Sequence, residues 1–239
     1  MSGTLGHPRL HLRLTDSTND RARALASAGA PHGTLVTASA QTAGRGRQGR
    51  RWSAPPGRSL LMSLVLRNPP PLLPLIAAVA VCDVAGEDYR VKWPNDIVLP
   101  GASGLAKLAG ILTEGRPQEG WAVLGVGLNV AVRLEELPAE LRATAATLGE
   151  SPAATESVLA RLLPALGRRL AEPTEALLDA YRTRDALLGR EIEWAAHSTE
   201  GRVGHGRAEG IDGEGRLVVA LDGGGHTSLD AGEVHLRSS

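Results

Sequence analysis

The stretch Gln41-Thr-Ala-Gly-Arg-Gly-Arg-Gln-Gly-Arg-Arg-Trp52 interleaves three glycines with four arginines and ends on a tryptophan. The glycines let the backbone adopt positive φ angles and bring N–H groups close to a ligand, and each arginine adds a planar, permanently charged guanidinium. This combination suits a phosphate. The apolar segments on either side, Leu35–Ala40 and Ser59–Leu66, have the pattern of strands, so we predict a basic loop over a β-sheet.

Two other interpretations of this loop were weighed. Gly44, Gly46 and Gly49 have the spacing of a dinucleotide fingerprint, but that motif must open a helix, and Ser-Ala-Pro-Pro-Gly follows the tryptophan instead. We therefore reject a Rossmann site. An Arg/Gly segment that touches RNA without sequence preference stays open as an alternative. DNA is not an expected partner, because 26 acidic residues balance 26 basic ones.

The rest of the composition predicts a soluble cytoplasmic protein without a membrane partner. The first ten residues lack the apolar core of a signal peptide, and the apolar run Leu72–Ala85 is too short to span a bilayer. The sole cysteine, Cys82, lies inside that run, which favours a buried helix residue over a nucleophile. The seven histidines show no paired spacing, so we expect no protein-bound metal.

The apolar periodicity divides the chain into a larger and a smaller part. Helices are expected at Asn19–Ala28 and Leu72–Ala85, and helical spacing returns from Val132 to Leu188 in segments that should flank the sheet. Beyond Gly189 short strands alternate with Gly/Asp turns and predict a small barrel. We place the domains at residues 1–188 and 189–239. The expected strands cover residues 10–14, 35–40, 59–66, 89–93, 97–99, 105–113, 121–129, 191–195, 202–206, 216–221 and 233–236.

Lysine is rare in this chain, and its two positions are informative. Lys92 and Lys107 are the only lysines among the 26 basic residues. A lysine where arginine is otherwise used suggests that the position requires a compact, flexible point charge. Lys107 also lies in the apolar segment Leu105–Thr113, where an unpaired ammonium would be costly to bury. It therefore needs an anionic partner, which is either a structural salt bridge or a ligand.

Five segments, in order, resemble the motif set of biotin protein ligases, and the tail after Gly189 is similar to their SH3-like C-terminal domain. The resemblance implies an α+β fold with a mixed, largely antiparallel sheet flanked by helices, like the catalytic domain of class II aminoacyl-tRNA synthetases, plus a small C-terminal SH3-like β-barrel. The five segments are Ser17–Asn19, Gln41–Trp52, Lys92–Asp96, Lys107–Glu114 and Gly125–Asn129.

This sequence departs from the family pattern in two ways. The first expected strand begins by Leu10, with no preceding helix-turn-helix, so the resemblance implies a monofunctional ligase rather than a DNA-binding repressor. The stretch Pro100–Ala106 makes the connection from Asp96 to Lys107 longer than expected.

The resemblance implies a reaction in two steps. Biotin attacks the α-phosphate of ATP to give biotinyl-5′-adenylate and pyrophosphate, and a lysine of a biotin carboxyl carrier protein then takes the biotinyl group. ATP and biotin are the expected substrates, with Mg²⁺ bridging the phosphates, and the enzyme is expected to be a monomer or homodimer. Because a carboxylate must approach a polyphosphate, cationic side chains are needed to offset the repulsion.

The resemblance also assigns roles to individual residues, although a helix cap at Ser17, a turn aspartate at Asp96 and core packing of Trp52 stay open. The expected catalytic residues are Lys107, Arg47 and Asp96. Biotin is expected to contact Ser17, Thr18, Asn19, Gln41, Arg45, Gly46, Arg47, Lys107, Gly110 and Gly125. The nucleotide is expected to contact Arg45, Arg47, Trp52, Asn95, Lys107 and Asn129.

Two alternative functions stay open beside this one. A lipoate ligase or octanoyltransferase of the same superfamily would use a similar sheet, and the transferase would need a cysteine nucleophile. An RNA-binding module made of the basic loop and the small barrel would need neither Lys107 nor ATP, and its affinity would fall with salt.

Overall fold

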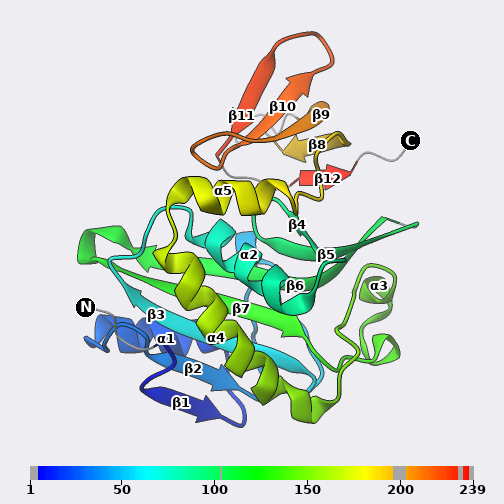
Figure 1. Cartoon of the computed structure of the whole chain (residues 1–239). Coiled ribbons are helices and arrows are strands. Elements are labelled where there is room, and N and C mark those ends of the chain that lie inside the picture. Colours follow the sequence, from blue (N-terminus) through cyan, green and yellow to red (C-terminus); the bar gives the residue numbers. More distant parts are fainter. Residues whose placement is uncertain (1–4, 103, 196–202, 231–233, 237–239) are drawn as a thin grey trace.

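The computed structural model describes residues 5–102, 104–195, 203–230 and 234–236. Its larger sheet has seven strands in the order β1-β2-β3-β7-β6-β5-β4 (Figure 1). Only β1 and β2 pair in parallel, and every other neighbouring pair in this sheet is antiparallel. The predicted α+β fold with a mixed, largely antiparallel sheet is thus confirmed. The strands are β1 (Arg9–Leu12), β2 (Leu35–Ala38), β3 (Ser59–Arg67), β4 (Arg90–Lys92), β5 (Asp96–Gly101), β6 (Gly104–Arg116) and β7 (Trp121–Asn129).

Helices cover both faces of this sheet. On one face lie α2 (Leu73–Ala85), α4 (Thr155–Ala171) and α5 (Thr174–Arg182), of which α2 and α4 cross the near face in Figure 1. On the other face α1 (Thr18–Ser27) packs through Ala22 and Ala26 against Val36, Val65 and Val123. The helices of the predicted 132–188 region therefore do flank the sheet, and the sheet separates a second, smaller core under α1 from the main one.

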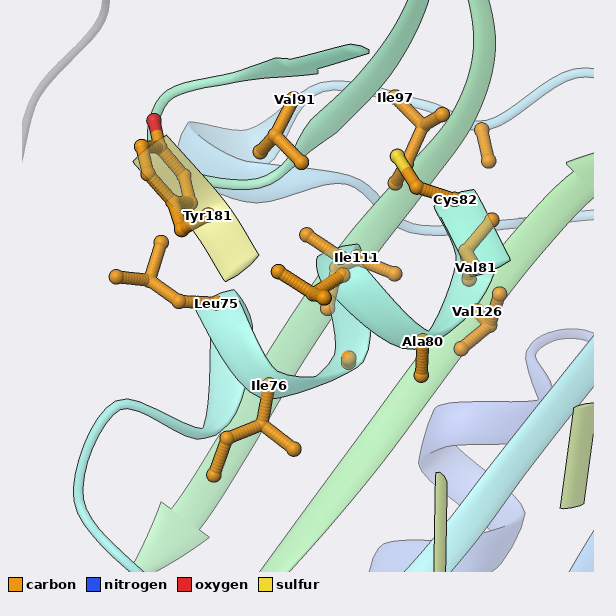
Figure 2. Packing of buried hydrophobic residues seen from close by; sticks show 14 of the residues in the cluster. Leu75, Ile76, Ala80, Val81, Cys82, Val91, Ile97, Ile111, Val126 and Tyr181 are labelled. Atoms are coloured by element: carbon orange, nitrogen blue, oxygen red, sulfur yellow. The ribbon is translucent and has the colours of Figure 1, made fainter. Parts of the chain in front are cut away.

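Helix α2 is apolar on all sides because it lies between the sheet and α4. Its side chains pack against Ile97, Ile111 and Val126 of the sheet (Figure 2). Pro74 lies in its first turn, and Gly86, with a φ of 119°, ends it. Cys82 is fully buried within it, which confirms the prediction of a buried helix residue.

The segment after β7 differs from the prediction. Helical spacing from Val132 predicted helical segments, but up to Ala154 the chain forms only the short elements η3 (Leu134–Glu136), α3 (Ala139–Arg142) and η4 (Pro152–Ala154). The reason is tertiary: the Lys107 N–H donates to the Thr144 carbonyl at 2.6 Å, and the Ala146 N–H donates to the Lys107 carbonyl at 2.8 Å. This segment continues the sheet beside β6 instead of folding on itself.

The C-terminal part forms a second, antiparallel sheet in the order β11-β10-β9-β8-β12, which lies above α5 in Figure 1. Four of its strands were predicted, β8 with its observed bounds and the other three with shifted bounds, whereas β11 was missed because His-Thr-Ser-Leu has little apolar pattern. Arg202 and Glu233, predicted to open two of them, lie outside the described residues. The strands are β8 (Glu191–Ala195), β9 (Val203–Ile211), β10 (Leu217–Leu221), β11 (His226–Leu229) and β12 (Val234–Leu236).

One turn of the small sheet is inserted into the larger part. Gly215 has a φ of 73°, which favours glycine, and a Cβ atom there would lie 2.6 Å from the Leu72 side chain and 2.9 Å from that of Leu75. The Trp93 indole N–H donates to the Gly215 carbonyl at 3.0 Å in a buried hydrogen bond.

Within the described residues, no helix is long and apolar enough to cross a membrane.

Candidate active site

A pocket of about 290 Å³ opens on the α1 side of the large sheet. Every residue that the sequence predicted for the site lines it, which brings together segments as distant as Ser17 and Asn129. Their individual roles stay predictions. The predicted residues in the lining are Ser17, Thr18, Asn19, Gln41, Arg45, Gly46, Arg47, Trp52, Asn95, Asp96, Lys107, Gly110, Gly125 and Asn129.

The pocket floor is a patch of bare backbone made by glycines of β6 and β7. Gly110 and Gly127 are direct partners in the sheet, and Gly125 lies two residues further along β7. Because side chains on one strand alternate between faces, these glycines share the face covered by α1. A Cβ atom at Gly127 would lie 2.6 Å from the Trp52 ring, and one at Gly125 would collide with Asn19. The glycines therefore allow side chains from the loop and from α1 to rest on the sheet.

Lys107 reaches this face because of a β-bulge. In a regular strand Lys107 and Gly110, three residues apart, would point to opposite faces. The register between β5 and β6 shifts, so that Ala109 lies opposite Ile97 while Lys107 lies opposite Val98. One extra residue in β6 thus turns the Lys107 side chain to the pocket, where a Cβ atom at Gly110 would lie 3.2 Å from its Cε.

Lys107 and Arg47 each meet a polar residue of the β4–β5 corner. The Lys107 ammonium lies 2.7 Å from Asp96 Oδ1, and the Arg47 guanidinium donates to Asn95 Oδ1 at 3.0 Å. The ammonium is also 5.9 Å from the centre of the Trp52 ring. Asn95 itself is fixed, because its side-chain amide donates to the Ile111 carbonyl at 2.8 Å. Asp96 is thus an anionic partner of the kind that the sequence predicted for Lys107.

The charges that line the pocket favour an anion. Among the described lining residues, arginines 45, 47, 50 and 51 join Lys107, whereas Asp96 is the sole carboxylate. The Lys107 side chain is 39% exposed although it is paired, so its ammonium can still approach a ligand. An incoming carboxylate or phosphate would therefore meet excess positive charge.

Short polar side chains gather at the start of α1. Ser17 is the N-cap residue by position, but its hydroxyl makes no cap hydrogen bond. Gln41 Oε1 accepts from the Thr18 N–H at 2.7 Å and from the Thr18 hydroxyl at 3.1 Å. Ser63, fully buried on β3, lies within hydrogen-bonding distance of both Thr18 and Asn19. These groups form one connected set of donors and acceptors for a polar ligand ring.

Trp52 has an unused donor. Its ring lies against Gly127 and Gly110, yet within the described part of the chain its buried indole N–H has no hydrogen-bond partner. A buried donor without a partner costs free energy. Trp52 is therefore neither a simple core residue nor a plain surface residue.

Sequence reasoning missed several residues in or next to the pocket. Ser63 contacts the lining residues Thr18 and Asn19, and it carried a signal, since it is a polar residue within the apolar strand segment Leu60–Leu66. Glu114 contacts Asn19 and closes one predicted motif, but it was given no role. Leu137, Leu141 and Thr144 belong to the segment predicted as helix, and nothing in their pattern shows that they face the pocket. The remaining apolar wall comes from Leu61, Met62, Ile111, Leu112 and Val126.

A cationic pocket with a glycine floor, a polar corner and an apolar wall defines a binding site for a small, partly apolar molecule that carries an anionic group. Comparison with known proteins is consistent with this class. The model of the biotin/lipoate A/B protein ligase family matches residues 11–130, and the model of the biotin protein ligase C terminal domain matches residues 188–237. The chain belongs to the biotin/lipoate A/B protein ligase family.

Individual relatives support the same family assignment. A biotin–[acetyl-CoA-carboxylase] ligase of Mycobacterium tuberculosis is 36% identical, over 93% of this chain and 87% of the relative. The bifunctional ligase/repressor BirA of Bacillus subtilis is 35% identical, over 92% of this chain and 71% of the relative. The structure of a biotin protein ligase from Aquifex aeolicus in complex with biotin and ATP superposes with a TM-score of 0.80 at 25% identity, covering 98% of this chain and 100% of that one.

Proposed function

We propose that this protein activates biotin with ATP to biotinyl-5′-adenylate and transfers the biotinyl group to a lysine of a biotin carboxyl carrier protein. The observation that carries the proposal is the bulged Lys107, which places an ammonium beside Asp96 and over the glycine floor of a cationic pocket. The family relatives named above support the same substrates.

The first step joins a carboxylate to the α-phosphorus of ATP. A biotin carboxylate oxygen forms the new P–O bond, and the bond from the α-phosphorus to the pyrophosphate breaks. Lys107 and Arg47 are the two cations that face the corner at Asn95 and Asp96. They would offset the repulsion between the reactants and stabilise charge that grows on the phosphate oxygens. Ser17, Thr18, Asn19 and Gln41 would hold the polar ring of biotin.

The second step releases AMP. The amine of the acceptor lysine attacks the carbonyl carbon of the mixed anhydride, and the bond to the phosphate oxygen breaks. The amine must lose a proton, and Asp96 is the carboxylate in reach of the reacting centre. Asp96 would first orient Lys107 and then hold the incoming ammonium as it deprotonates.

Mg²⁺ is expected to arrive with ATP. Within the described residues, no group of three or more histidine, cysteine or acidic side chains is placed to hold a metal ion. The donor set therefore fits a metal bound mainly by substrate phosphates, whose charge it would neutralise. A cytoplasmic location, a monomer or homodimer, and a domain boundary at Leu188 stay predictions from the sequence.

The alternatives are less well supported. The family model that matches residues 11–130 covers lipoate ligases as well, but the C-terminal model is that of biotin protein ligases. A cysteine-dependent transferase does not fit, because Cys82 is fully buried in α2, on the face of the sheet opposite the pocket. An RNA-binding module would not require the enclosed pocket behind the basic loop.

Exchange of labelled pyrophosphate into ATP by the purified chain tests the proposal. Biotin should support exchange, while lipoate and octanoate at the same concentration should not. Exchange with lipoate but not with biotin would indicate that the protein is a lipoate ligase. No exchange with any acid, together with salt-dependent RNA binding, would favour the RNA-binding alternative.

A further inference from the structure

Four charged side chains meet where the basic loop, α1 and β6 come together. Arg45 of the loop lies 2.8 Å from Asp20 Oδ1 and 3.1 Å from Glu114 Oε1. Arg23 of α1 contacts the same two oxygens, at 3.2 Å and 3.0 Å. Two guanidinium groups, one on the loop and one on a helix, therefore share two carboxylates.

Glu114 is held from the inside of the protein. Its side chain is 17% exposed, and its second oxygen accepts from the Asn19 amide at 2.9 Å. Asn19 is buried, and its own oxygen accepts from Ser63 at 2.6 Å. Because Glu114 is fixed in this way, it presents a stationary negative charge to the loop. Removing a partner from a half-buried carboxylate is costly, so the carboxylate favours keeping both arginines.

Within the loop, Gly44–Trp52 forms a hairpin whose two sides are tied to different parts of the protein. Its internal hydrogen bonds, from the Gly46 N–H to the Arg50 carbonyl and from the Trp52 N–H to the Gly44 carbonyl, hold it as a narrow hairpin. Arg45 then ties one side of that hairpin to Asp20 and Glu114, while Arg47 ties the other side to Asn95. Fixing the backbone of such a glycine-rich segment costs conformational entropy, so side-chain anchors matter.

We propose that Arg45 is a positioning residue that anchors the loop through Asp20 and Glu114, rather than a ligand of the phosphate. The anchor sets the position of Arg47, two residues further on, beside Asn95 and Lys107. To reach a phosphate, Arg45 would have to leave two carboxylates, of which Glu114 is half-buried. The effect of this anchor on catalysis rests on the function proposed above, but the anchoring of the loop by Arg45 does not.

Limited trypsin digestion of the ligand-free protein tests the anchor directly, with cleavage after Arg50 and Arg51 followed by mass spectrometry. Glu114→Gln and Arg45→Ala should each be cut about fivefold faster than the parent, since partly exposed ion pairs are worth up to about 1 kcal/mol. Arg23→Ala is the matched control. It removes the other cation from the same carboxylates but leaves the loop contact, so its cutting rate should stay within about twofold of the parent.

The double variant Arg45→Ala with Glu114→Gln separates anchoring from a general loosening of the fold. If Glu114 acts on the loop through Arg45, the double variant is cut no faster than Arg45→Ala alone. Additive acceleration, or parent-like cutting of both single variants, would overturn the proposal. Equal acceleration in Arg23→Ala would also overturn it, because the whole cluster rather than the loop contact would then be responsible.

Biotin-dependent pyrophosphate exchange gives the second readout. An anchor predicts that Arg45→Ala and Glu114→Gln lower kcat/KM for biotin in parallel, by about the factor seen in digestion, while Arg23→Ala does not. A phosphate ligand predicts a lower kcat for Arg45→Ala, with normal digestion and a normal Glu114→Gln. If the parent catalyses no exchange, the proposed function fails, but the digestion experiment still tests whether Arg45 anchors the loop.

Discussion

Gly127 shows how much a single residue contributes to this pocket. It has no unusual backbone conformation, so its role is to leave space rather than to supply a positive φ angle. The Trp52 ring fills that space, and its unsatisfied N–H lies buried beside the glycine. Residue-scale features of this kind depend on which side chain lies above the glycine, and that neighbour is far away in the sequence.

Gly127→Ala should leave the fold intact but disturb the pocket. The new Cβ would lie 2.6 Å from the Trp52 ring, which belongs to a loop and can move away. We expect a melting temperature close to that of the parent and at least about tenfold weaker exchange activity, because small displacements of binding groups are costly. Gly213→Ala, where a Cβ meets open space, is the control and should match the parent in both measurements.

Cys82 supports a prediction about reactivity. Burial raises the pKa of its thiol to about 12, so the thiol stays protonated at neutral and mildly alkaline pH. A thiol reagent at pH 8 should therefore not modify the native protein on the time scale on which it labels the denatured chain completely. Rapid labelling of the native protein, with activity lost in parallel, would contradict this prediction and would indicate a functional role for Cys82.

At the scale of elements, the sequence predicts the positions of helices and strands better than it predicts the contacts between them. The strands around the basic loop, the helix at α1 and the buried α2 follow from periodicity and were predicted close to their observed bounds. The bulge in β6 was not predicted, because an apolar strand with one extra residue has the same pattern as one without it. The 132–154 segment was assigned to helix because local spacing says nothing of its hydrogen bonds to Lys107.

Asn129 tests how that segment is held. Its side-chain amide donates to the Ala146 carbonyl at 3.0 Å, and its oxygen accepts from Ser59 at 3.2 Å. Asn129→Ala would leave both partners unsatisfied in a buried position, at a cost of about 1–3 kcal/mol of stability. Since residues 144–146 flank Lys107, we also expect a higher KM for ATP than in the parent. Normal ATP saturation in a destabilised variant would limit Asn129 to a structural role.

At the scale of the whole molecule, the two sheets are joined beneath the active site. Trp93 precedes Asn95 and Asp96 by two and three residues, and its indole N–H is bound by the Gly215 carbonyl of the small sheet. Residues of the small sheet such as Ile192 and Leu217 belong to the same hydrophobic cluster as α2. The composition of the tail predicted a separate unit, but it contained no signal for this shared core.

Trp93→Phe should weaken both stability and catalysis. It removes a buried hydrogen bond and leaves the Gly215 carbonyl unpaired, which we expect to cost about 1–3 kcal/mol. Trp194→Phe removes the same type of ring from the small sheet without touching the Lys92–Asp96 segment. The first variant should lower both the melting temperature and the exchange rate, and the second only the melting temperature. Equal exchange rates in the two variants would contradict a positioning role for Trp93.

The most direct test of the account is the single-turnover rate at which biotinyl-5′-adenylate forms in the parent and in Lys107→Ala. Biotin and ATP are mixed with excess enzyme, and the adenylate is measured by mass spectrometry after acid quenching. Loss of one preorganised cation should slow its formation by at least about 100-fold, while the melting temperature stays near that of the parent. A rate within about threefold of the parent would show that Lys107 does not act in adenylate formation.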